Sequence, residues 1–304
     1  MDKLATWQEL KNCHFDLQLS TTLPSGHLLE AQNAIELWLK NRPLSADQRP
    51  ENTGVQQMFG IPSLVISIDC APNHALNILD IEGGAGGLGL AQLINDPLSR
   101  RLEQIRRGWP EIKFFASDSM AAKHDYDLWL EGACAPDVAK QADLLFIISA
   151  PGELPGYGHL SAAPLLTRGD KTYGEGWLWD NVGFDQFEAL FFRCQSGFCL
   201  KSQHSRHMKD LYIFHPHRCL LDRRGIHGAS TRSQIFRALR QHEVMYCQPF
   251  QEAVFALGDM PTVHRIFFLF DVKSKEYVYA GGLLISRPSL KTCSVYNATF
   301  GVVN

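Results

Sequence analysis

The sequence predicts an α+β fold, and three observations lead to this class. The last third of the chain alternates short apolar strands with one amphipathic helix at 230–242, which is typical of antiparallel sheets. In the middle, 111–119 and 143–151 read as buried strands with a helical segment between them, which predicts a parallel α/β lobe. Before that lobe, 62–70 and 75–84 are apolar runs joined by an Asn-His corner, so we expect a hairpin.

The remaining elements follow from local spacing and composition. Residues 27–40 have the apolar spacing of a helix, and 88–108 predict a second helix that is interrupted near Pro97. The apolar segment 189–195 (ALFFRCQ) is expected to form a strand. Residues 151–185 are rich in Gly, Pro and Trp and are expected to be mostly irregular.

A chain of 304 residues is too long for one small core, so we expect several lobes. The predicted divisions are an N-terminal part at 1–84, a Rossmann-like α/β lobe at 85–155 and a C-terminal part at 156–304. The net charge of −3, with scattered Lys and Arg, gives no reason to expect nucleic acid or a membrane as partner. A homodimer is compatible with the sequence.

The predicted location is the cytoplasm. The eight cysteines are irregularly spaced inside apolar runs and form no C-x-x-C pair, which favours reduced, buried thiols over disulfides or zinc. The N-terminal segment lacks a basic region followed by an apolar core, so no signal peptide is predicted. No apolar run reaches the 18 or so residues that a membrane helix needs.

Polar residues that suit nucleotide binding occur in a fixed order in the last third. Lys201 ends a strand and can neutralise the α- and β-phosphates, and Ser205 and Arg206 lie in the polar loop that follows it. Gln248 lies in the connection after a later strand, where a polar side chain can read the adenine edge. Arg265 lies inside an apolar strand and can reach a γ-phosphate during its transfer. We therefore expect a nucleotide cleft formed by these strands.

This order resembles the ATP-grasp family: a Lys at a strand end, a loop, a Gln at the hinge, an Arg before an apolar run, and a strand that closes on Tyr-Ala-Gly-Gly at 279–282. The resemblance covers about the last 115 residues. It implies that the chain binds ATP and Mg²⁺ and is a ligase that joins a small-molecule carboxylate to an amine through an acylphosphate. A second family lysine is expected before Lys201, and Lys171 is the candidate.

The carboxylates that hold Mg²⁺ in this family normally follow the Arg strand, but here they are predicted at the front of the chain. Asp69, Asp80 and Glu82 take the acidic positions of the hairpin and offer the hard oxygen ligands that Mg²⁺ prefers. This order resembles the circularly permuted, glutathionylspermidine synthase-like branch. It implies an α+β fold with a permuted ATP-grasp core and an inserted Rossmann-like lobe.

This sequence departs from the family pattern at two places, which leaves its activity open. The family's Glu-x-Asn is replaced by Asp80-x-Glu82, and the glycine-rich phosphate loop is replaced by His204, Ser205 and Arg206. A non-catalytic ATP-grasp-like binding protein is therefore a second hypothesis.

A third hypothesis is an S-adenosylmethionine-dependent methyltransferase. The Gly-rich turn at 78–89 would lie against the cofactor, and Asp118 would hold the ribose hydroxyls. The two folds require different sheets. The permuted fold pairs 63–84 with 264–286, so that the carboxylates face Arg265 across the cleft, whereas the methyltransferase pairs 76–82 with the strands at 112–118 and 143–149.

Overall fold

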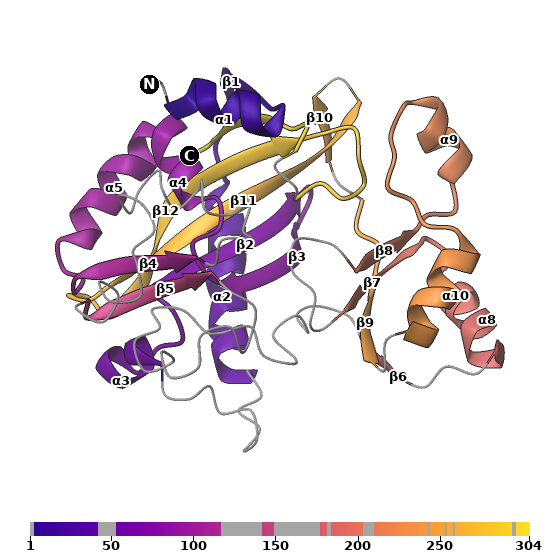
Figure 1. The fold of residues 1–304 in the computed structure, drawn as a ribbon, viewed down its shortest axis with the longest axis horizontal. Coiled ribbons are helices and arrows are strands. Elements are labelled where there is room, and N and C mark those ends of the chain that lie inside the picture. The colour runs from indigo at the N-terminus through magenta and orange to yellow at the C-terminus, as the bar shows by residue number, and fades with distance from the viewer. Residues whose placement is uncertain are drawn as a thin grey trace.

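The computed structural model describes most of the chain as a mixed α+β structure, in agreement with the predicted class. The described residues are 3–41, 53–116, 142–148, 177–180, 184–202, 210–241, 244–252, 254–257, 259–293 and 296–304. Lys171, Ser205, Arg206 and Asp118 lie outside them. Figure 1 shows a larger part that contains both chain ends and a smaller part built from the orange segments.

The larger part is built on a seven-stranded mixed sheet in the order β1–β13–β12–β11–β2–β3, with β10 paired to the first part of β11. Its strands are β1 (His14–Thr21), β2 (Val65–Pro72), β3 (Leu76–Gly83), β10 (Val254–Leu257), β11 (Met260–Asp271), β12 (Glu276–Ser286) and β13 (Thr299–Val303). β1 is parallel to β13, and the other neighbours are antiparallel. The predicted hairpin therefore exists, and its pairing with the 264–286 strands is confirmed.

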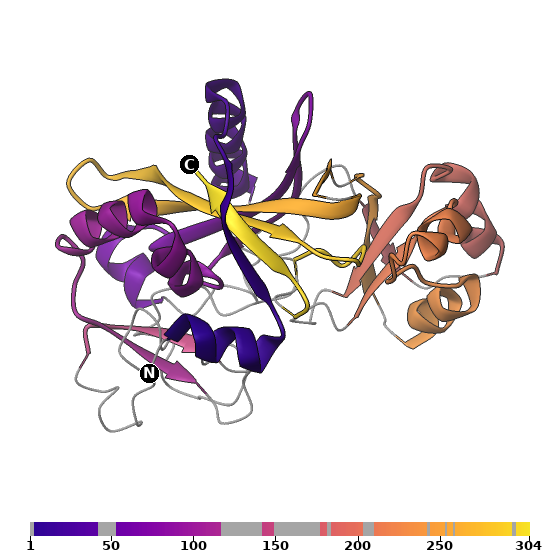
Figure 2. The ribbon, with the colours of Figure 1, turned by 90° about the horizontal axis from the view of Figure 1, so that it is seen from above.

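Helices cover both faces of this main sheet. They are α1 (Lys3–Lys11), α2 (Ser25–Asn41), α3 (Gly54–Phe59), α4 (Leu88–Ile94) and α5 (Asp96–Arg106). Side chains alternate along β11, so Val263 and Phe267 lie in the core beneath α4 and α5, while Ile266 and Phe268 lie in the core beneath α2. Figure 2 shows α2 on one side of the sheet and α1, α4 and α5 on the other.

The predicted helix at 88–108 is interrupted where expected, and Asn95 explains the break. Its side-chain oxygen accepts a hydrogen bond from the N–H of Leu98 at 3.0 Å, which caps α5. Its amide nitrogen donates to the carbonyls of Gly282 and Val303 at 3.1 and 3.0 Å. One side chain thus begins a helix and fixes that helix to β12 and β13.

The smaller part is a four-stranded antiparallel sheet in the order β6–β9–β7–β8. Its elements are β6 (Trp177–Asp180), α8 (Phe184–Arg193), β7 (Phe198–Ser202), β8 (Leu211–Phe214), α9 (Arg218–Arg223), α10 (Arg232–Gln241) and β9 (Val244–Pro249). Phe198 and Leu200 pack against α8 and α10, whereas Cys199 belongs to the cluster beneath α9. Because side chains alternate along a strand, Lys201 lies on the same face as Cys199.

The prediction of a strand at 189–195 is wrong, because this segment belongs to α8 and the turn that follows it. Leu190, Phe191 and Cys194 are buried, whereas Phe192 is 83% exposed. Buried residues one and four positions apart form a helical stripe, not the alternation of a strand. A short apolar run fits the residue spacing of a helix as well as that of a strand. The segment forms a helix because one side of it packs against β7.

The sheet pairing that a methyltransferase requires is not observed. β4 (Ile112–Ala116) and β5 (Leu144–Ile148) are parallel, as the sequence predicts, but they form a separate two-stranded sheet. β3 is antiparallel to β2 and ends the main sheet. The helices α4 and α5, which were expected in the Rossmann-like lobe, pack with their apolar sides into the core of the main sheet.

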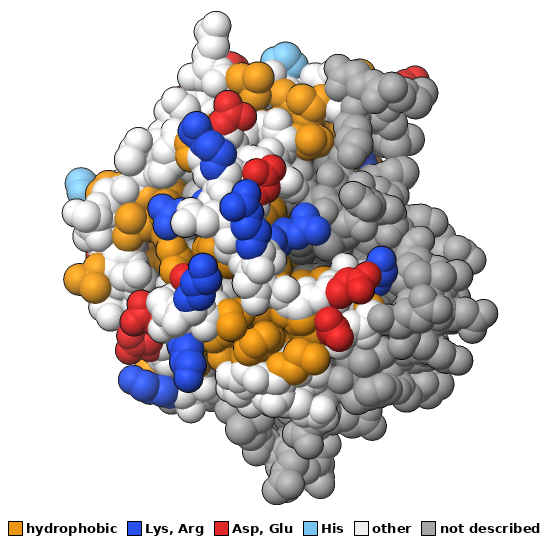
Figure 3. All heavy atoms as spheres, turned by 90° about the vertical axis from the view of Figure 1, so that its left-hand side faces the viewer, with side chains coloured by type: hydrophobic (Ala, Val, Ile, Leu, Met, Phe, Trp, Pro, Cys, Tyr) orange, Lys and Arg blue, Asp and Glu red, His pale blue; other side chains and the backbone are white. Residues whose placement is uncertain are grey.

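The described surface is of mixed charge. Figure 3 shows the side that carries α5, where Lys and Arg side chains are interspersed with Asp and Glu. None of the helices in the described ranges is long and apolar enough to cross a membrane. The seven cysteines that the structure describes are free thiols, as the sequence suggests.

One buried histidine makes stability depend on pH. His264 lies on the α2 face of β11 and is 9% exposed, and burial, with a smaller effect from His27, lowers its pKa from 6.5 to about 4. The unfolded chain therefore binds a proton that the folded chain excludes, so stability is complete above about pH 6.5 and falls as the pH is lowered toward 4. The loss is on the order of 3 kcal/mol.

We expect His264→Phe to flatten this part of the pH dependence, measured as urea midpoints between pH 4 and 7. His74→Gln is the control, because His74 is exposed on the β2–β3 turn and should leave the slope unchanged. An unchanged slope in His264→Phe would contradict the assignment.

Candidate functional site

The carboxylate hairpin presents its acids on one face of the main sheet. Asp69 lies opposite Asp80 across the β2–β3 pair, and Ser67 lies opposite Glu82. Cross-strand partners share a face, and so do residues two apart, so Asp80 and Glu82 lie on the same face as Asp69. Asp69 is buried, Asp80 is half-buried and Glu82 is exposed.

Arg265 lies beside these acids in the same sheet. It is the register partner of Asp69, and its Nε and Nη2 donate to the two carboxylate oxygens of Asp69, each at 2.7 Å. The side chains of Arg265 and Asp69 are only 14% and 4% exposed. Our expectation that Asp69 faces Arg265 across a cleft is wrong, because the two are neighbours on adjacent strands and form a bidentate ion pair.

Arg265 remains a cation in this setting. Burial opposes its charge, but the Asp69 carboxylate outweighs burial and raises the pKa of Arg265 well above its usual value, with a further contribution from Glu82. The ion pair also offsets the charge of Asp69, which lies directly opposite Asp80 in the β2–β3 pair.

The glycine-rich turn after β3 packs over Arg265. Nη1 of Arg265 donates to the carbonyl of Gly86 at 3.4 Å. Gly87 has a φ of +85°, and a Cβ there would lie 3.3 Å from Cδ of Arg265. Glycine therefore permits both the left-handed backbone and the close approach. In this structure the turn covers the ion pair and begins α4.

Cys293 is a member of this cluster that the sequence did not single out. Its thiol hydrogen-bonds to Asp69, and burial together with the Asp69 charge raises the pKa of Cys293 well above its usual value. Asp80 contributes in the same direction. Cys293 lies in an irregular segment after β12 that carries no sequence motif. Only its contacts in the folded structure show that it belongs to this cluster.

Lys201 connects the smaller sheet to the carboxylate hairpin. Its Nζ donates to the backbone carbonyl of Leu79 in β3 at 2.7 Å, and the two residues are 122 positions apart in the chain. Leu79 directly precedes Asp80, so the contact brings the Lys strand against the carboxylate strand. Gln248 is 5% exposed and lies opposite Cys199 in the β7–β9 pair, which puts it on the same face as Lys201.

The three acids do not form a ready-made metal cage. No group of three or more His, Cys, Asp or Glu within the described ranges is arranged to hold a metal ion. Both oxygens of Asp69 accept hydrogen bonds from Arg265, whereas Asp80 and Glu82 lie on β3, the strand that Lys201 contacts. Mg²⁺ commonly takes one or two carboxylates together with phosphate oxygens and water, so these two residues fit such a site.

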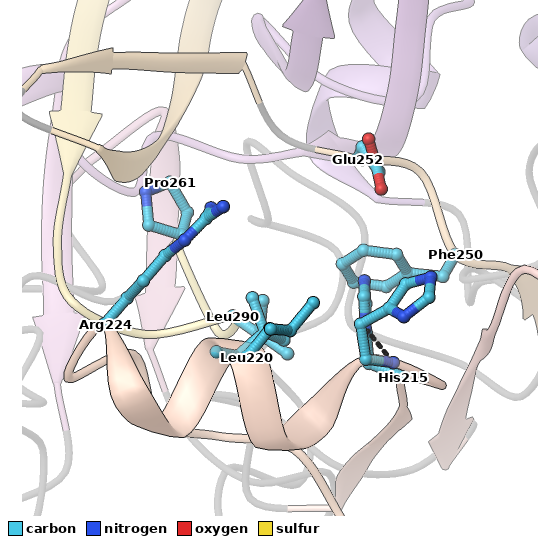
Figure 4. Close-up of a pocket in the computed structure, with 9 residues that line it drawn as sticks. His215, Leu220, Arg224, Phe250, Glu252, Pro261 and Leu290 are labelled. Carbon is cyan, nitrogen blue, oxygen red and sulfur yellow. Dashed lines mark hydrogen bonds between the residues drawn. The ribbon is translucent and has the colours of Figure 1, made fainter.

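A pocket of about 130 Å³ lies where the smaller part meets the main sheet. Figure 4 shows the His215 and Phe250 rings side by side, with Glu252 on the linker after β9 and Arg224 rising from α9 toward Pro261. Burial lowers the pKa of His215. The lining residues are His215, His217, Leu220, Leu221, Arg224, Phe250, Glu252, Pro261 and Leu290.

Most of the predicted site residues that the structure describes lie near this junction. Asp69, Asp80, Glu82 and Arg265 share one face of the main sheet, and Lys201 contacts the strand that carries Asp80. Neither a protein-family model nor a curated protein matches this sequence.

Proposed function

We propose that the chain is an ATP- and Mg²⁺-dependent carboxylate–amine ligase with a circularly permuted ATP-grasp core. The observation that carries this proposal is the hydrogen bond from Lys201 to Leu79. Through it, three segments far apart in sequence meet: the carboxylate hairpin, the Lys strand and, through the Asp69 ion pair, the Arg strand. A cation, two carboxylates on one strand face and a buried Arg are the groups that phosphoryl transfer uses.

The nucleotide is proposed to lie along the junction of the two sheets. Lys201 would neutralise the α- and β-phosphates, and Gln248 on the same face would read the adenine edge. The adjoining pocket, with the Phe250 ring on the linker after β9, offers an apolar wall for a purine. ATP would then extend from this linker toward β3.

Asp80 and Glu82 would hold Mg²⁺ together with phosphate oxygens, and the metal would offset charge that develops on the phosphates. Arg265 would act electrostatically, because Asp69 fixes its orientation and keeps it charged beside the transferring group. In the proposed reaction the substrate carboxylate attacks the γ-phosphorus of ATP and ADP leaves. The amine then attacks the acylphosphate carbon, phosphate leaves and the amine loses a proton.

We expect Lys201→Ala to weaken ATP binding about 10- to 100-fold, because it removes a charge-assisted hydrogen bond to phosphate. Calorimetric titration with ATP and Mg²⁺ is the measurement. Lys273→Ala is the matched control, since Lys273 is exposed on the β11–β12 turn and should leave the affinity unchanged. Equal ATP affinities for wild type and Lys201→Ala would show that the phosphate site is misplaced.

A non-catalytic ATP-binding protein is the second candidate, and one observation favours it. Both oxygens of Asp69 accept hydrogen bonds from Arg265, so the hairpin offers a metal fewer carboxylates than the sequence predicts. Phosphate release from ATP and Mg²⁺ in a mixture of amino acids separates the two. The ligase predicts release that depends on the mixture, and the binding protein predicts ATP affinity with no release.

A further inference from the structure

The segment from Arg287 to Cys293 is held between the two parts of the molecule. The N–H of Leu290 donates to the carbonyl of His227 at 2.8 Å, and the N–H of His227 donates to Pro288 at 3.2 Å. Gly228, with a φ of +101°, approaches so closely that a Cβ there would lie 3.0 Å from Oγ of Ser289. These contacts make the segment a fixed bridge from β12 to the loop that follows α9.

Arg287 lies at the start of this bridge, on the face of the main sheet that carries Arg265. Its N–H donates to Pro261 at 3.2 Å, which continues the β11–β12 ladder. Leu283 is the register partner of Arg265, so the two side chains lie on one face of the sheet. Side chains alternate along a strand, so Arg287, four residues after Leu283, lies on that face too. Cys293 interacts electrostatically with both arginines, so it lies close to both.

The guanidinium of Arg287 is buried with one donor unused. Arg287 is 7% exposed, and its Nη1 donates to the carbonyl of Lys291 at 3.1 Å. Its Nε is buried and has no hydrogen-bond partner within the described residues. A buried donor of a charged group is costly to leave unpaired, so this one calls for an acceptor.

A second cation lies beside it. Lys291 is half-buried, and its N–H donates to Oγ of Ser289 at 3.2 Å, which fixes the turn. Burial lowers the pKa of both Lys291 and Arg287; for Lys291, attraction to Asp210 partly offsets burial, and a smaller repulsion from Arg287 adds to it. In the part of the chain that the structure describes, neither cation has an ion pair.

Two neighbouring, partly desolvated cations without a paired carboxylate destabilise a fold. A fixed turn that holds them together is therefore better explained by a bound anion than by stability. We propose that Arg287 and Lys291 form an oxyanion-binding subsite, which takes a phosphate or carboxylate group beside the Asp69–Arg265 pair. The subsite does not depend on the proposed ligase activity, and its ligand is either a nucleotide phosphate or the carboxylate of a second substrate.

The test is the melting temperature of the full chain with inorganic phosphate or with succinate, at constant ionic strength set by NaCl. We expect at least one of the two anions to raise the Tm saturably by about 2 °C or more. A response to phosphate alone identifies the phosphate source, and a response to succinate identifies the carboxylate source. No response to either anion overturns the proposal.

Lys291→Met distinguishes a binding role from a structural one. We expect it to reduce the anion-induced shift to less than half and to change the Tm of the ligand-free protein by less than about 1 °C, because the loss of repulsion from Arg287 and the loss of attraction to Asp210 oppose each other. A lower ligand-free Tm together with an unchanged anion response would overturn the proposal. Lys273→Met should change neither quantity.

Discussion

Replacing Arg265 with Met should lower the free energy of unfolding by about 3–5 kcal/mol, because it leaves the Asp69 carboxylate buried without its partner. Asp69 is 4% exposed, and both of its oxygens accept from Arg265 at 2.7 Å. Its other neighbours offer little replacement, since Asp80 has the same charge and Cys293 supplies one weak donor. The urea midpoint, with an unchanged m value, is the measurement.

The double substitution Asp69→Leu with Arg265→Met should recover most of that loss, because a buried ion pair can often be replaced by apolar groups at little cost. Arg218→Met is the matched control. Arg218 pairs with Asp222 at 3.5 Å, but both side chains are about half exposed, so the loss should be less than about 1 kcal/mol. A loss in Arg265→Met no larger than in this control would contradict the buried-pair energetics.

The same double variant separates folding from chemistry. If Arg265 serves only the fold, a stable double variant should keep the phosphate release of the wild type. The ligase proposal predicts that release is lost, since the variant removes the charge that Asp69 orients beside the transferring phosphoryl group.

Local patterns in the sequence account for the carboxylate hairpin. Its two strands are apolar runs around a tight corner, so strand identity and the shared face of Asp80 and Glu82 follow from period-2 geometry, whereas the register shift beside Asp69 does not. The order of Lys201, Gln248 and Arg265 in later strands was also visible. What joins them, the Lys201–Leu79 and Arg265–Asp69 contacts, spans more than 100 positions and depends on the sheet order.

Other elements were not predicted, and the reasons differ. The edge strand β1 alternates apolar Phe15, Leu17 and Leu19 with polar residues, a strand period that the prediction did not use; its burial pattern is mixed, Leu17 is exposed, and its pairing with β13 depends on the fold. The helix α8 is short and apolar on most sides, which fits either period. Arg287, Lys291 and Cys293 lie in a connecting segment that contains no motif. They are identified as candidate site residues only by their burial and their neighbours in the folded structure.

The hairpin carboxylates lead to the prediction with the largest effect on nucleotide binding. Asp80→Asn with Glu82→Gln should abolish the dependence of ATP binding on Mg²⁺, which means a loss of at least about tenfold in affinity with the metal present. The fold should persist, because Asp80 is half-buried, Glu82 is exposed and both replacements keep the side-chain shape. Calorimetric titration with ATP, in Mg²⁺ and in EDTA, is the measurement.

The ATP titration in EDTA shows whether the two carboxylates act through a metal ion, because there the double substitution should have the opposite effect. In EDTA the two carboxylates repel the phosphates of ATP, so their neutralisation should leave binding unchanged or strengthen it, opposite to its effect in Mg²⁺. Glu103→Gln, on the exposed side of α5, should alter neither arm. If the double variant binds ATP more weakly in EDTA by the same factor as in Mg²⁺, the carboxylates act through the fold and not through a metal ion. If it keeps the wild-type response to Mg²⁺, the metal site lies elsewhere.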